Sequence, residues 1–71
     1  MKKNDRIVVK SEMGRGIECP IVDYDSHKGK LWVRLPTNDV LEMNFIEKRK
    51  VFVGKMARLE FTANPKDVIE A

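Results

Sequence analysis

Hydrophobic and polar residues alternate without interruption between Lys30 and Leu35, in a stretch bounded by Gly29 and Pro36. In an extended strand, residues two apart share a face, so the aliphatic residues of this stretch lie on one side and the others lie on the opposite side. The aliphatic set consists of Leu31, Val33 and Leu35. The opposite set consists of Lys30, Trp32 and Arg34. The first set predicts a core-facing surface, and the second places the only tryptophan of the chain between two cations.

Similar alternation predicts four more strands along the chain. They cover residues 5–10, 17–24, 40–46 and 51–62, and turns rich in Gly, Pro, Asn, Asp or charged residues separate them. Gly54 interrupts the last segment and indicates a bend or bulge that lets one long segment contact two neighbours. After it, Asn64 and Pro65 fit the cap and first position of a helix, so residues 64–71 are expected to form either a short helical turn or a tail.

No apolar period of 3.6 residues persists over three turns, so the pattern favours an all-β chain. A flat sheet of five strands would leave one face wet and two edges open, which a chain of 71 residues tolerates poorly. We therefore predict one small five-stranded antiparallel barrel over residues 1–63, followed by the helical turn or tail of residues 64–71. Its predicted core consists of Ile7, Val9, Leu31, Val33, Leu35, Leu41, Met43, Phe45, Leu59 and Phe61.

The order of strand, glycine loop, strand, polar turn and strand, followed by two more strands, resembles the small SH3-like barrels, including the KOW and Tudor-type modules. KOW modules place a glycine between their first two strands, where this chain has Gly14 and Gly16. Only Tyr24 and Trp32 lie on the segments that carry the aromatic cage of methyl-lysine-binding Tudor modules. The resemblance implies an SH3-like barrel that binds nucleic acid or protein and has no enzymatic activity.

Charge and composition narrow the choice of partners only slightly. Fourteen Lys and Arg residues oppose eleven Asp and Glu residues, and the resulting net charge of +3 mildly favours anionic partners. The single cysteine excludes an internal disulfide, and Cys19 with His27, the only histidine, cannot supply four zinc ligands. No apolar run approaches the roughly 20 residues that span a bilayer, and no hydrophobic signal region is visible, so the cytoplasm is the expected compartment, or the host cytoplasm for a viral protein.

Two groups of residues are candidates for contacting a nucleic acid, either RNA or DNA. The strand surface formed by Lys30, Trp32 and Arg34, extended by Tyr24 and Lys28, is a basic-aromatic strip on which a base can stack, worth roughly 1–3 kcal/mol, while cations hold phosphates. The alternative for this strip is that Trp32 packs on a second apolar cluster and the cations are merely solvated. The second group consists of Lys48, Arg49 and Lys50, which lie in one turn. These cations either contact phosphates or simply form a solvated turn.

Catalysis and cofactor binding are not expected. His27 lies in a polar turn without a predictable nucleophile partner, and Cys19 next to Pro20 is expected at the core or a sheet edge. The leading hypothesis is therefore a non-catalytic nucleic-acid-binding barrel. The alternative is a protein-binding or inhibitory module, such as a phage or mobile-element accessory protein, that docks on a larger partner through Pro20 and the Gly14–Gly16 loop.

A third hypothesis follows from a partial resemblance to PilZ domains, which bind cyclic di-GMP through an RxxxR pair and a DxSxxG motif. Arg6 and Lys10 have the spacing of the first motif, and the run from Ser26 to Gly29 matches SxxG. Tyr24 stands where that motif has its aspartate. The resemblance implies cyclic-dinucleotide binding.

Overall fold

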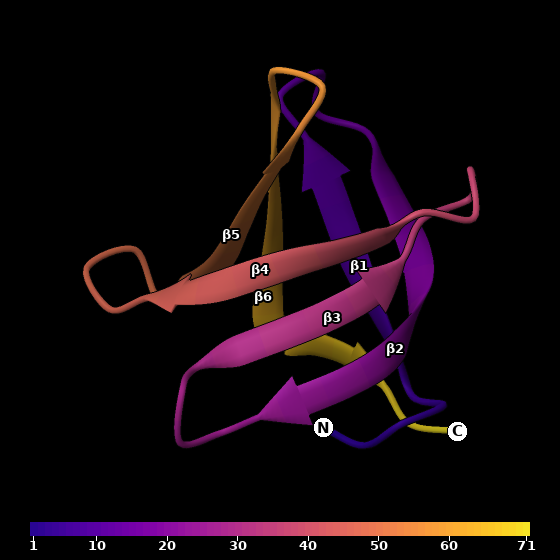
Figure 1. Cartoon of the computed structure of the whole chain (residues 1–71), viewed down its shortest axis with the longest axis vertical. Coiled ribbons are helices and arrows are strands. Elements are labelled where there is room, and N and C mark those ends of the chain that lie inside the picture. Colours follow the sequence, from indigo (N-terminus) through magenta and orange to yellow (C-terminus); the bar gives the residue numbers. More distant parts are fainter.

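Six strands follow one another around a closed barrel in the computed structural model, which describes residues 1–71 (Figure 1). They are β1 (Arg6–Ser11), β2 (Gly16–Asp25), β3 (Lys30–Arg34), β4 (Val40–Ile46), β5 (Val51–Met56) and β6 (Leu59–Ile69). Each strand pairs antiparallel with the next, and β6 closes the barrel against β1. The predicted all-β barrel class is confirmed, but the number of strands is six rather than five.

The segment expected to form one long fifth strand is divided into β5 and β6. The chain reverses at Ala57 and Arg58, whose φ angles are 50° and 68°. Two successive residues with positive φ suit a tight hairpin turn, because this backbone twist matches that of the flanking strands. Gly54, where the bend was expected, lies inside β5 instead. A Cβ atom there would lie 2.7 Å from the backbone oxygen of Glu42, so this glycine permits a close approach of β4 and β5.

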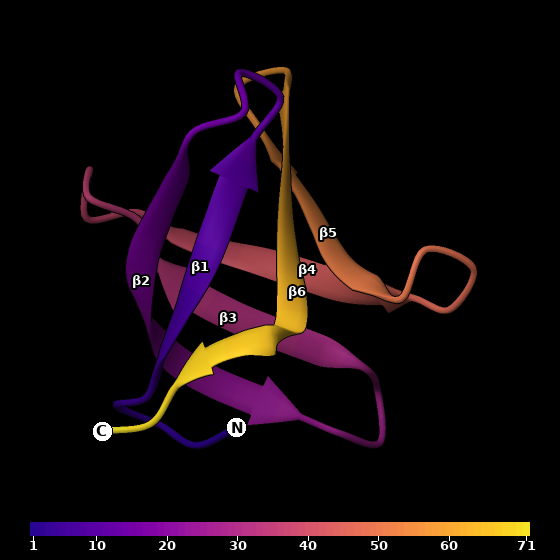
Figure 2. The same cartoon turned by 180° about the vertical axis from the view of Figure 1, so that it is seen from behind.

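The helical turn considered for the C-terminal residues is absent, because residues 64–69 continue β6, and Val68 and Ile69 pair with the beginning of β1. The register of this pairing shifts, and β6 bends near its end (Figure 2). Within the bend, the Asn64 side-chain oxygen accepts a hydrogen bond of 2.9 Å from the Lys66 backbone N–H. Asn64, which suggested a helix cap, thus stabilises the bend in a strand through its side chain. Pro65, which has no N–H, is tolerated at such an irregular position.

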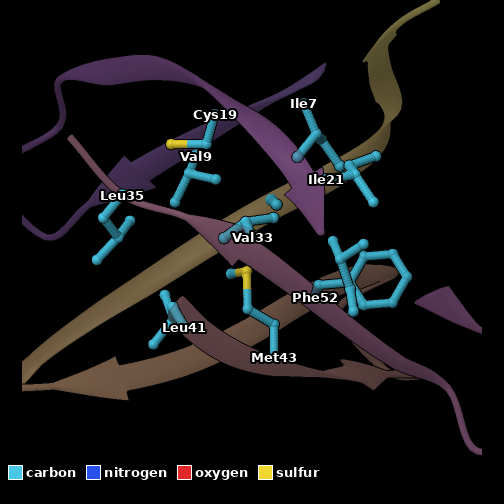
Figure 3. Close-up of a cluster of buried hydrophobic side chains, with 11 residues drawn as sticks. Ile7, Val9, Cys19, Ile21, Val33, Leu35, Leu41, Met43 and Phe52 are labelled. Atoms are coloured by element: carbon cyan, nitrogen blue, oxygen red, sulfur yellow. The ribbon is translucent and has the colours of Figure 1, made fainter. Parts of the chain in front are cut away.

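The core fills the inside of the barrel (Figure 3). It consists of Ile7, Val9, Cys19, Ile21, Leu31, Val33, Leu35, Leu41, Met43, Phe52 and Ala63. Three residues predicted in the core are not fully buried, namely Phe45, Leu59 and Phe61. They share the inner faces of their strands, but they lie toward the strand ends, where the barrel opens. The core also contains Cys19, which was expected at the core or a sheet edge, and three residues that the prediction missed, Ile21, Phe52 and Ala63.

Candidate nucleic-acid interface

The outer surface of β3 carries the strip that alternation predicts. Leu31 and Val33 are buried in the core, whereas Trp32 and Lys30 are partly exposed and Arg34 is exposed on the opposite side. The register places Trp32 between two acidic residues on the neighbouring strands, Asp23 of β2 and Glu42 of β4. We call the outer surface formed by Lys30, Trp32, Arg34, Asp23 and Glu42 the Trp32 face.

Glu42 holds two of the strip residues at once. Its Oε1 atom accepts a hydrogen bond of 3.2 Å from the Trp32 indole N–H, and its Oε2 atom forms an ion pair of 3.0 Å with Lys30 Nζ. Hydrogen bonding and the positive charge of Lys30 lower the pKa of the Glu42 carboxyl, and the indole N–H adds to this effect. The contacts fix the direction of the indole ring and compensate the charge of Lys30.

Arg34 lies at the far end of β3 and supports the next turn. One of its guanidinium nitrogens, Nη1, is 3.2 Å from both the backbone oxygen and the side-chain oxygen of Asn38. Asn38 has a φ of 74°, a conformation that asparagine adopts more readily than most residues. Because a guanidinium has five N–H donors, Arg34 retains donors for a phosphate group.

Tyr24 does not belong to the Trp32 face. The pairing of β2 with β3 shifts between Ile21 and Asp23, and this bulge places Tyr24 opposite Leu31, on the core side. The tyrosine ring packs edge-on against Phe52, with 6.1 Å between the ring centroids. A sequence signal for the bulge exists, because unbroken alternation after Ile21 would have pointed the Asp23 carboxylate into the core.

Lys28 extends the Trp32 face along the turn between β2 and β3. The Asp25 carboxylate closes this turn by accepting hydrogen bonds from the backbone N–H groups of His27 and Lys28, at 3.0 and 3.2 Å. The Lys28 side chain is exposed and makes no ion pair. The same turn contains the stretch that resembles a PilZ motif, and its backbone is held by the chain's own aspartate.

The turn between β4 and β5 contains the second predicted group of cations. It projects from the same side of the barrel as the β2–β3 turn (Figure 1), and near the base of both turns the Phe45 N–H of β4 donates to the Gly29 oxygen at 2.8 Å. Lys50 pairs with Glu47 at 2.6 Å within the turn. Arg49 pairs with Glu60 of β6 at 3.4 Å, so its side chain is directed toward β6 rather than toward Trp32. Lys48 is the one cation of this group without an ion pair.

Sequence analysis missed the two carboxylates that flank the indole, Asp23 and Glu42. Their positions follow from the strand register, which alternation alone does not give. The length of the turns and the bulge in β2 determine which residues lie opposite Trp32. With both acidic residues included, the Trp32 face is close to neutral rather than basic.

The structure also places the single cysteine, the potential metal ligands and two surface cavities. Cys19 is buried, and burial raises the pKa of its thiol. No group of three or more His, Cys, Asp or Glu side chains is placed to hold a metal ion. Two surface cavities, of about 210 and 170 Å³, lie away from the Trp32 face, and Arg49 borders the larger one. The chain forms no helix that is long and apolar enough to cross a bilayer.

Comparisons of the chain with protein-family models, with curated proteins and with solved structures gave no match. The fold class of a small closed all-β barrel therefore stands on the strand order and register alone.

Proposed function

We propose that the chain is a non-catalytic SH3-like barrel that binds single-stranded nucleic acid on the Trp32 face. The observation that supports this function is the indole of Trp32, which is partly exposed and held at its N–H by Glu42. A ring whose polar atom is satisfied and whose direction is fixed is a ready platform for one base, because little side-chain freedom is lost on stacking.

The charges around Trp32 determine how the phosphates are held in this proposal. Lys30 is already paired with Glu42, whereas Lys28 has no ion pair and Arg34 has unused donors. Lys28 and Arg34 are therefore the principal phosphate contacts, and Lys48 is a third on the neighbouring turn. Base stacking supplies most of the affinity, and the salt dependence is weaker than the number of nearby cations suggests.

The test is titration of a short fluorescein-labelled oligonucleotide of mixed sequence, as DNA and as RNA, at several salt concentrations. Trp32→Ala is expected to weaken binding by roughly 1–3 kcal/mol, while Arg34→Ala lowers the salt slope by about one unit. Glu42→Gln keeps an oxygen for the indole N–H and releases Lys30, so it is expected to tighten binding and raise the salt slope by about one unit. Lys66→Ala, on the bent end of β6, is the control and should change little.

The Glu42→Gln variant makes the experiment specific to this site, since a loss of stability cannot strengthen binding. If Trp32→Ala folds and binds as the original chain does, or if Glu42→Gln weakens binding, the Trp32 face is not a nucleic-acid interface. In that case the indole and its two carboxylates have a structural role only.

A further inference from the structure

One end of the barrel exposes apolar side chains, most of which belong to the inner faces of its strands. The β1–β2 hairpin and the β5–β6 hairpin meet there (Figures 1 and 2), and the Glu60 N–H donates to the Glu12 carboxylate across them at 2.7 Å. The exposed or partly exposed residues at this end are Met13, Ile17, Met56, Leu59 and Phe61, which we call the apolar end.

The strand register shows why these side chains are left uncovered. Ile17 lies directly opposite the buried Val9, so it belongs to the core-facing side of β2, yet 43% of it is exposed. Leu59 is two positions before Phe61 on the inner face of β6 and is 37% exposed. Met13, at the tip of the β1–β2 loop, is 83% exposed. The inner faces thus extend beyond the core at this end, and nothing in the chain covers them.

A free strand edge runs alongside the apolar end. β3 pairs with β2 only from Ile21 to Asp25, so the first half of β2, residues 16–20, has β1 on one side and no strand on the other. The backbone N–H and C=O groups of such an edge are available to an added strand. Pro20 supplies no N–H, which limits pairing at the inner end of this edge.

Among the residues of the apolar end that make no ion pair, cations outnumber carboxylates: Lys10, Arg15, Lys55 and Arg58 against Glu12 and Glu18. Arg15 and Arg58 lie on the two hairpin tips, and neither makes an ion pair or a side-chain hydrogen bond. Glu60 is paired with Arg49, whereas Glu12, which accepts only the neutral Glu60 N–H, and the exposed Glu18 keep their negative charges. A partner that covers this end must therefore bring negative charge together with apolar side chains.

We propose that the apolar end binds an extended segment of a partner protein that combines apolar and acidic residues and adds as a strand beside residues 16–20 of β2. Its apolar side chains cover Ile17, Met13 and Leu59, and its acidic side chains meet Arg15 and Arg58. A second copy of the chain is disfavoured as the occupant, because it brings the same net positive charge. In an antiparallel edge pair over residues 16–20, the two Glu18 carboxylates would also lie directly opposite each other. This surface is separate from the Trp32 face, so the proposal does not depend on nucleic-acid binding.

The test uses the whole chain to select from a phage-displayed library of random linear peptides. Enriched peptides are expected to combine apolar residues with Asp or Glu, and a synthetic peptide of the enriched sequence is then titrated into ¹⁵N-labelled protein. Amide shifts are expected along residues 16–20 and at Leu59, but not at Trp32. The double variant Met13→Ser with Ile17→Thr should lower the affinity by at least about tenfold, and Arg15→Glu should weaken binding more than Arg15→Lys.

Ile69→Thr is the matched control, because Ile69 is also 43% exposed but pairs with Arg6 near the opposite end of β1. It should bind as the original chain does, and all variants are checked for an unchanged circular dichroism spectrum. Enrichment of basic peptides, or no enrichment above that on the double variant, would overturn the proposal. Self-association that the double variant abolishes, or oligonucleotide-induced shifts at these same amides, would assign the surface to another occupant and overturn it as well.

Discussion

Trp32 and Glu42 lie opposite each other on β3 and β4, and the indole N–H donates to the carboxylate at 3.2 Å. The same carboxylate pairs with Lys30 at 3.0 Å. One acidic residue therefore fixes the direction of the ring and neutralises the neighbouring cation. These two effects act in opposite directions on a bound nucleic acid, because a fixed ring favours stacking and a neutralised lysine weakens phosphate attraction.

The indole should become more mobile when its acceptor is removed. Trp32 is the only tryptophan in the chain, so tryptophan fluorescence reports on this ring alone. Glu42→Ala is expected to increase quenching by acrylamide, whereas Glu42→Gln, which keeps a side-chain oxygen, should leave quenching close to the original. Equal quenching in the two variants would mean that the hydrogen bond does not hold the ring in solution.

Gly54 should be intolerant of any side chain, because the backbone of β4 passes close to it. A Cβ atom would lie 2.7 Å from the Glu42 backbone oxygen and 3.0 Å from the Met43 side chain. Gly54→Asn is expected to destabilise the barrel by about 1–3 kcal/mol, measured by urea unfolding, since the two strands must move apart.

Gly14→Asn is the control for this substitution. Gly14 has a φ of 85°, a value that asparagine tolerates, and nothing lies within 4 Å of an added Cβ atom. It should therefore lose far less stability than Gly54→Asn. Equal losses in the two variants would argue against a close approach of β4 and β5 at Gly54.

Asp5 should stabilise the fold at neutral pH and lose this effect in acid. Its two carboxylate oxygens accept the backbone N–H groups of Lys2 and Ala71, at 3.1 and 3.0 Å, and so join the two ends of the chain. The hydrogen bond from Ala71, followed by that from Lys2, lowers the Asp5 pKa from its usual 3.8. A lowered folded-state pKa adds stability above the unfolded value, and this stability is lost as the pH falls below 3.8.

Asp5→Asn is expected to reduce the free energy of unfolding at pH 7, since an amide offers only one accepting oxygen to two N–H donors. The difference from the original chain should shrink as the pH falls through and below 3.8, where the carboxyl itself becomes protonated. Urea unfolding at neutral and acidic pH measures both values. Asp67→Asn, at an exposed site, is the control, and a difference for Asp5→Asn that does not change with pH would contradict this role.

Alternation was sufficient to predict the regular strands, which have one face toward the core and one toward solvent. The predicted strand 40–46 has the same limits as β4, and Trp32 lies on the outer surface as expected. Where the strands are irregular, the same reasoning failed. The bulge in β2 places Tyr24 on the core side rather than on the outer surface. At Asn64 the chain bends and continues as β6, where a helical turn or a tail was expected.

The composition of the candidate site was only half predictable for the same reason. Alternation gives the residues that share a face of one strand, and it correctly grouped Trp32 with Lys30. The residues on neighbouring strands depend on register, which turn lengths and bulges set. Glu42 and Asp23 were therefore absent from the predicted site, although they determine its charge.

The turn at Ala57 and Arg58 was the feature least visible in the sequence, and it can be strengthened. Both residues have positive φ, at 50° and 68°, in a two-residue connection between Met56 and Leu59. Asn and Gly adopt this conformation with less strain than Ala and Arg, and Asn-Gly is a preferred pair for such a turn. The double variant Ala57→Asn with Arg58→Gly is expected to stabilise the barrel by about 1 kcal/mol, which corresponds to a melting temperature higher by roughly 4–8 °C. Ala57→Val, whose branched side chain resists positive φ, should lower the melting temperature. If the Asn-Gly variant melted at or below the original temperature, the reversal between β5 and β6 would not have this tight geometry.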